Sequence, residues 1–153
     1  MVGQALAADE AQDDWKDAGR MPRLLVVDDE ILHRLIICRA AAKVGYVPVG
    51  AASSREAARL SQEGEFDCIT LDIALGDHGG AVALLRHLAE VDCKAPIIVV
   101  SACDDETLHE TLGVARSLKL NVAEPVPKPV DLTILRHMLE GFRGQAIGGA
   151  EPA

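Results

Sequence analysis

The stretch Leu24-Leu25-Val26-Val27-Asp28-Asp29-Glu30 decides the fold prediction for this chain of 153 residues. Four consecutive apolar residues followed by acidic ones are typical of a short strand that is buried on both faces. A strand of this kind needs helices on either side of its sheet. The stretch therefore predicts the first strand of a parallel sheet in an α/β domain.

Strand and helix patterns alternate after this stretch. Further strands are predicted at residues 47–49, 66–71, 97–100 and 121–127. A helix from Ser53 is indicated by a capping box with Glu56. The other helices are marked by apolar residues at helical spacing: Ile31, Leu35, Cys38 and Ala42, with Gly45 as the stop; Leu84, Leu85, Leu88 and Val91; Leu108, Leu112 and Ala115, entered through Asp104 and Asp105; and Leu132, Leu135, Leu139 and Phe142.

Five strand–helix pairs predict a doubly wound, five-stranded parallel sheet with helices on both faces. Pro125 and Pro127 cannot donate to a strand ladder, so the last strand is expected at an edge. That expectation agrees with the strand order 2-1-3-4-5. We divide the chain into an N-terminal extension over residues 1–21, one domain over residues 22–143 and a flexible tail over residues 144–153.

Composition excludes several classes of protein. The net charge is −9, and the fifteen lysines and arginines are scattered, which argues against a nucleic-acid-binding surface. No apolar run is long enough to span a membrane, and residues 1–20 lack the pattern of a signal peptide, so a cytoplasmic location is expected. The cysteines form no C-x-x-C pair and are expected to be free thiols: Cys38, Cys68, Cys93 and Cys103.

Polar residues stand at the end of each predicted strand except the second. The first strand ends in Asp28 and Asp29, the third in Asp72, the fourth in Ser101 and the fifth in Lys128. Ligands of such sheets bind at the carboxyl ends of the strands. Three clustered carboxylates favour a bound cation, for which Mg²⁺ is the natural choice, and one of them can then attack a phosphoryl group.

Four pieces of the sequence together resemble the receiver domain of two-component response regulators, over about residues 22–143. The pieces are Leu24-Leu25-Val26-Val27-Asp28-Asp29-Glu30, then Asp72, then Val99-Val100-Ser101-Ala102, then Lys128-Pro129. The resemblance implies the flavodoxin-like receiver fold. It also implies a phosphoacceptor that is not an enzyme, apart from Mg²⁺-dependent phosphorylation and dephosphorylation of itself.

The resemblance also implies a role for each residue of the rim. Asp72 would be the phosphoacceptor, Lys128 would pair with the phosphoryl oxygens and Ser101 would be the switch hydroxyl. Mg²⁺ would be held by Asp28, Asp29, Asp72 and the backbone carbonyl of Ala74. The Lys128–Pro129 bond is often cis in this family. Expected partners are a histidine kinase or histidine phosphotransfer protein and a separate downstream protein.

The sequence departs from the family pattern in four ways. Gly76 replaces the usual proline after the phosphoacceptor, and Pro125 replaces the aromatic residue that normally precedes the lysine by three positions. The interval from Ser101 to Lys128 is longer than usual, which is similar to receivers found with cyclic-dinucleotide phosphodiesterase domains. We also expect a stand-alone receiver, because no output domain follows the last predicted helix.

Alternatives remain open at this stage. Gly76 and Pro125 favour a receiver-like binding scaffold that does not use phosphate. A phosphatase of haloacid-dehalogenase type would need a second aspartate where Ala74 stands. Asp29 can equally cap a helix, and the faces of the last two helices can support a homodimer. The histidines are expected on solvated faces: His33, His78, His87, His109 and His137.

Overall fold

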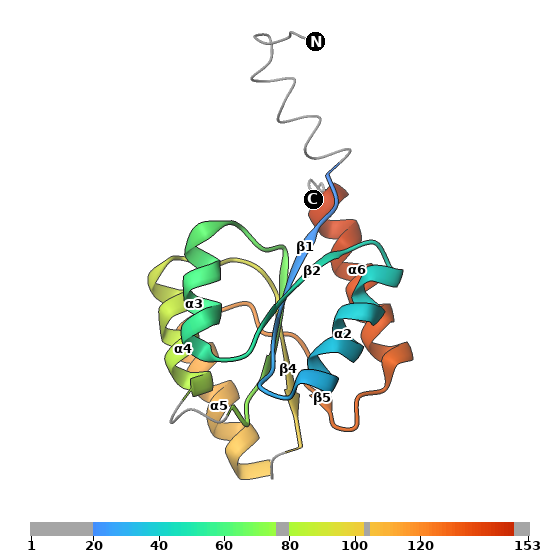
Figure 1. The fold of residues 1–153 in the computed structure, drawn as a ribbon. Coiled ribbons are helices and arrows are strands. Elements are labelled where there is room, and N and C mark those ends of the chain that lie inside the picture. Colours follow the sequence, from blue (N-terminus) through green and yellow to red (C-terminus); the bar gives the residue numbers. More distant parts are fainter. Residues whose placement is uncertain (1–19, 76–79, 103–104, 149–153) are drawn as a thin grey trace, which may run out of the picture.

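A computed structural model shows a single five-stranded parallel sheet with helices on both sides (Figure 1). It describes residues 20–75, 80–102 and 105–148. The strand order is β2-β1-β3-β4-β5, which confirms the predicted fold class and strand order. The strands are β1 (Arg23–Val27), β2 (Val47–Ala51), β3 (Cys68–Asp72), β4 (Ile97–Ser101) and β5 (Val126–Pro127).

The helices follow the strands in strict alternation. They are α2 (Ile31–Lys43), α3 (Ser54–Glu63), α4 (Gly80–Glu90), α5 (Asp105–Ser117) and α6 (Leu132–Gly148). The last helix continues past Gly144, where the sequence predicted a flexible tail to begin. Glycine lowers helix stability without forbidding the conformation, and the residues after Gly144 are compatible with a helix.

The sheet separates two apolar layers. Side chains that alternate along β1, β3 and β4 belong to two clusters, one shared with α3, α4 and α5 and the other with α2 and α6. Figure 1 shows these two groups of helices on opposite faces of the sheet. Leu25, Ile69 and Val99 lie in the first layer, and Leu24, Cys68 and Ile98 lie in the second. Because both faces are covered, these three strands are buried along almost their whole length, as the continuous apolar run of β1 predicted for that strand.

Two local signals in the sequence form the caps that they predicted. Gly45 has φ +96° just after α2, and its N–H donates to the Ala42 carbonyl at 3.1 Å. The Tyr46 N–H donates to the Ala41 carbonyl, which completes a Schellman motif. At the start of α3, Ser53 Oγ accepts the Glu56 N–H at 3.1 Å. The carboxylate of Glu56 accepts the Ala52 N–H. In a regular capping box it would accept the N–H of the N-cap residue, which here is Ser53.

The buried face of α2 differs from the predicted one. Ile31 and Leu35 were expected to face the core but are 61% and 55% exposed. The buried residues are Ile37, Ala40 and Ala41. Apolar residues lie all around this helix, so their spacing alone cannot identify the side that packs on the sheet.

The last strand is shorter than predicted. Residues 121–127 were expected to form one strand, but Val122 makes an isolated bridge to Ile97 and only Val126–Pro127 pair as β5. The prolines at 125 and 127 limit the ladder, because neither has an N–H to donate. The strand lies at the edge of the sheet, as those prolines predicted.

Other expectations concern single features. Cys38, Cys68 and Cys93 are free thiols, whereas Cys103 lies outside the described residues. Within residues 20–75, 80–102 and 105–148, no helix has the length and apolar character needed to cross a membrane. Arg20 was assigned to the N-terminal extension, but its guanidinium binds Asp67 through two contacts of 2.8 Å.

Candidate functional site

The predicted site residues meet at the carboxyl ends of the strands, at the lower end of the sheet in Figure 1. Asp28 follows β1 directly and is 1% exposed, and Asp72 ends β3 and is 2% exposed. Ser101 is buried at the end of β4, and Lys128 follows β5. The parallel register of neighbouring strands is what brings residues so far apart in the sequence to one rim.

Three carboxylates form the centre of this rim. Oxygen atoms from Asp28, Asp29 and Asp72 all lie within 4.8 Å of one another. Two of these residues are buried, and clustered carboxylates repel one another unless positive charge lies among them. Hard oxygen donors suit Mg²⁺, which binds protein carboxylates and retains several waters. The donor set therefore fits the predicted metal.

Lys128 supplies the positive charge beside the cluster. Its ammonium donates to Asp72 Oδ2 at 3.1 Å and lies 3.8 Å from Asp28 Oδ2. Burial acts to lower the pKa of Lys128, but the hydrogen bond and charge of Asp72, together with the charges of Asp28 and Glu30, raise it overall. The side chain is therefore a cation held beside the cluster at neutral pH.

The backbone after β3 orients the other oxygen of Asp72. The Ala74 N–H donates to Asp72 Oδ1 at 3.0 Å, so both carboxylate oxygens have partners. The loop that carries Ala74 continues into residues 76–79, and Gly76 therefore lies outside the described residues, as does His78. The metal-binding role of the Ala74 carbonyl stays a prediction.

Asp28 is held by three residues that follow it. Its Oδ1 accepts the Glu30 N–H at 2.9 Å, its backbone carbonyl accepts a guanidinium N–H of Arg34 at 2.7 Å, and its Oδ2 is in hydrogen-bond contact with His33 Nδ1. Neither His33 nor Arg34 was predicted to belong to the site. His33 was expected on a solvated face, which is wrong: its side chain is only 16% exposed.

A positional signal for His33 exists in the sequence. A helix that begins at Ile31, immediately after a strand that ends at the rim, must place residue 33 in its first turn beside that rim. The polar character of histidine alone does not distinguish this position from one on a solvated face. A second histidine also departs from the expectation, because His87 is half-buried and its Nε2 is buried without a hydrogen-bond partner among the described residues.

The chain matches the family pattern at Lys128–Pro129 and departs from it at Pro125. The Lys128–Pro129 bond is cis, as expected. Pro125 is half-buried just before β5, at the position where an aromatic residue was expected in the family. The chain therefore has no aromatic ring at this position.

The fold and the acidic rim define a doubly wound, flavodoxin-like α/β domain with a carboxylate cluster at the ends of its strands. The family model for the response regulator receiver domain matches residues 24–140. The chain belongs to this family, which confirms the resemblance seen in the sequence. The likeness to receivers found with cyclic-dinucleotide phosphodiesterase domains stays a prediction.

Individual relatives agree with the family model. The chain is 30% identical over 108 residues to the chemotaxis protein CheY of Thermotoga maritima, covering 70% of this chain and 85% of that protein. It is 33% identical to a protein-glutamate methylesterase/protein-glutamine glutaminase of Archaeoglobus fulgidus but covers only 30% of that protein. A solved response regulator from Colwellia psychrerythraea has a TM-score of 0.71 and 27% identity, with 82% of this chain and 98% of that chain covered.

Proposed function

We propose that this chain accepts a phosphoryl group on Asp72 from the phosphohistidine of a kinase or phosphotransfer protein. The observation that carries the proposal is the convergence of Asp72, Asp28, Asp29 and Lys128 on one rim in a member of the receiver family. We place the reaction in the cytoplasm and assign it to residues 22–143, flanked by the extension (residues 1–21) and the tail (residues 144–153).

In the proposed step, a carboxylate oxygen of Asp72 attacks phosphorus. The phosphorus–nitrogen bond of the donor breaks, and the leaving imidazole keeps the electron pair and takes up a proton. Lys128 and the Ala74 N–H orient the Asp72 carboxylate before the attack. Mg²⁺ held by Asp28 and Asp29 would neutralise charge on the transferring oxygens. Ser101 would then donate to a phosphoryl oxygen, and Lys128 would pair with another.

Intact-protein mass spectrometry tests the proposal directly. The wild type, Asp72→Asn and Asp92→Asn are incubated with acetyl phosphate and Mg²⁺. Asp92 is an exposed aspartate after α4, so its variant makes the same chemical change away from the rim. A gain of about 80 Da, that of one phosphoryl group, is expected in the wild type and in Asp92→Asn only.

Small phosphodonors do not serve every receiver, so a negative result is repeated with a phosphorylated histidine kinase as the donor. If neither donor gives an adduct on the wild type, or if Asp72→Asn gains the same mass, the phosphoacceptor proposal is wrong.

A second candidate function is a binding scaffold that does not use phosphate. Pro125 supports it. In the usual receiver mechanism an aromatic side chain at this position turns inward after phosphorylation and passes the signal on, and Pro125 has no aromatic ring that could do so. This function predicts that Asp72→Asn binds its partner as tightly as the wild type. A tenfold change in partner affinity on phosphorylation would exclude it.

A further inference from the structure

The outer side of α2 carries exposed apolar side chains that the phosphoacceptor site does not use. Five of the eight exposed large apolar residues in the described part of the chain lie on α2 or at the start of β2: Ile31, Leu32, Leu35, Ile36 and Val47. We call these five residues, together with Pro48, the α2 patch. Leu32, Leu35, Ile36 and Pro48 also line a groove of about 490 Å³. Contiguous exposed apolar surface of this kind marks an interaction site.

Positive charge borders the α2 patch toward the end of the helix. Arg39 lines the groove, and Lys43 follows one turn later as the last residue of α2. Both side chains are exposed, and neither forms an ion pair with another described residue. The surface is therefore complementary to a segment that combines apolar side chains with acidic ones.

The N-terminal extension has the sequence of such a segment. Its apolar residues over 8–18 recur at helical spacing: Ala8, Ala11, Trp15 and Ala18. Acidic residues occupy the other faces of that helical pattern: Asp9, Glu10, Asp13, Asp14 and Asp17. With Lys16 as the single base, five acidic residues give residues 9–17 a net charge of −4. The extension thus offers both an apolar stripe and the charge opposite to that of Arg39 and Lys43.

The extension joins the domain next to the α2 patch. The Pro22 carbonyl accepts the N–H of Val47 at 2.8 Å, so the described chain begins within two residues of a contact with the patch. Figure 1 shows α2 ending toward the end of the sheet at which β1 begins. A helix over residues 8–18 would be about 17 Å long, and the 13 residues of α2 span about 20 Å. The segment can therefore lie along α2 with its acidic residues beside Arg39 and Lys43.

We propose that residues 8–18 dock as a helix on the α2 patch of the same chain, with Trp15 in the groove. A segment tethered beside its site has an effective concentration of about millimolar, which favours it over a second copy of the protein. The patch begins at Ile31, two residues after Asp29, so the docked segment borders the carboxylate rim. The docking goes beyond the proposed phosphoacceptor function and does not rest on it.

The fluorescence of Trp15 tests the docking, because it is the only tryptophan of the chain. Its emission maximum and its quenching by acrylamide are measured in the wild type and in two patch variants, Leu35→Asp and Arg39→Glu. The matched controls are Val91→Asp and Arg86→Glu. Both control residues are exposed and lie in or just after α4, on the opposite face of the sheet (Figure 1). Circular dichroism checks that each variant is folded.

In the wild type and both controls, Trp15 is expected to emit at a shorter wavelength than free tryptophan and to be protected from acrylamide. Leu35→Asp should weaken docking about tenfold or more, as the loss of an apolar anchor does, so that the emission moves to the red and quenching rises. Arg39→Glu should act in the same direction, with a smaller effect in 1 M salt, where the Debye length is about 3 Å. A fully exposed Trp15 in the wild type, or protection that is unchanged in folded Leu35→Asp, would overturn the proposal.

Dilution distinguishes docking within one chain from docking between two. Docking within one chain does not depend on protein concentration, so the protection of Trp15 should persist through about a hundredfold dilution. Protection that is lost on dilution would assign the patch to a second copy and overturn the proposal. Because these measurements use no phosphodonor, an exposed Trp15 excludes only the docking, whereas a chain that gains no phosphoryl group on Asp72 excludes only the phosphoacceptor function.

Discussion

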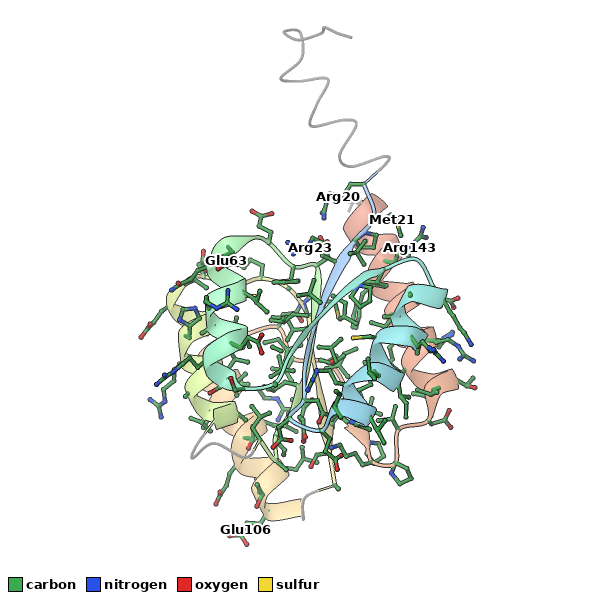
Figure 2. The ribbon with its side chains drawn as sticks, in the orientation of Figure 1. Arg20, Met21, Arg23, Glu63, Glu106 and Arg143 are labelled. Carbon is green, nitrogen blue, oxygen red and sulfur yellow. The ribbon has the colours of Figure 1, made fainter. Side chains whose placement is uncertain are left out.

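Asp67 ties the start of the domain to the start of β3. It accepts two hydrogen bonds from the Arg20 guanidinium and one from the Arg23 backbone N–H, each at 2.8 Å. Figure 2 shows Arg20 and Arg23 together at the end of the sheet opposite Glu106, which lies at the start of α5. Burial acts to raise the pKa of Asp67, but these hydrogen bonds and the two guanidinium charges lower it overall.

We predict that Asp67→Asn destabilises the protein by about 1.5–3 kcal/mol near pH 7, the range for hydrogen bonds to charged groups. Because the folded-state pKa lies below the unfolded value, this stabilisation is present above the unfolded pKa and is lost as the pH falls through the folded one. Urea unfolding at pH 7 and at pH 3.5 should therefore give a smaller difference from the wild type in acid. An equal difference at both pH values would contradict the prediction.

The side chains of the site were only partly predictable. Asp28, Asp72, Ser101 and Lys128 were found because each follows an apolar strand, and the ends of parallel strands share one rim. His33 and Arg34 lie in the first turn of α2, so their position after β1 places them near the rim, but the sequence pattern does not show which atoms they contact. Their contacts with Asp28 depend on how α2 turns away from β1, which only the packed fold determines.

The turn after α2 offers a test of backbone conformation. Gly45 has φ +96°, and a Cβ atom there would stand 2.6 Å from Nε of Arg143 (labelled in Figure 2). Gly113 lies within α5, and a Cβ atom there would meet nothing within 4 Å. These two glycines therefore differ in whether the fold needs them.

We predict that Gly45→Ala lowers the free energy of unfolding by about 1–2 kcal/mol, because a side chain is strained in this region of backbone conformation. Gly113→Ala should raise it by about 0.5–1 kcal/mol, the gain from replacing glycine within a helix. Urea denaturation of the two variants beside the wild type measures both effects. A Gly45→Ala variant as stable as Gly113→Ala would show that the turn does not require glycine.

The elements themselves could be predicted to different degrees. β1 and β4 were clear because both faces are covered and each holds four consecutive apolar residues, and within Cys68–Leu71 of β3 the apolar run is interrupted only by Thr70. β5 was overestimated, because two prolines leave only two residues paired. The position of α2 was predicted but its buried side was not. Apolar residues occur on both its buried and its exposed sides, so their spacing does not identify the side that packs on the sheet.

Metal binding should be visible in the stability of the whole domain. If Mg²⁺ binds among Asp28, Asp29 and Asp72, it binds the folded state alone, and the stabilisation grows with the logarithm of its concentration above the dissociation constant. At ten times its dissociation constant the gain is about 1.4 kcal/mol. The melting temperature of the wild type should rise with Mg²⁺ and return to its starting value on addition of EDTA.

The variant Asp28→Asn should lose most of this rise, because it removes one donor from the cluster. Asp131→Asn is a control at the start of α6, where Asp131 accepts backbone N–H groups and lies outside the cluster. An equal rise in Asp28→Asn would show that the cation acts elsewhere on the molecule.

Each edge strand of the sheet has a proline whose nitrogen faces away from the neighbouring strand. Val47 donates its N–H to Pro22, so the next nitrogen along β2, that of Pro48, faces away from β1. Lys128 donates to Ser101, which likewise turns the nitrogen of Pro127 outward from β4. Each margin thus lacks a donor just where an incoming strand would need one. Growth of a fibre by strand addition would lose a hydrogen bond at either margin of the described sheet, so both margins disfavour it.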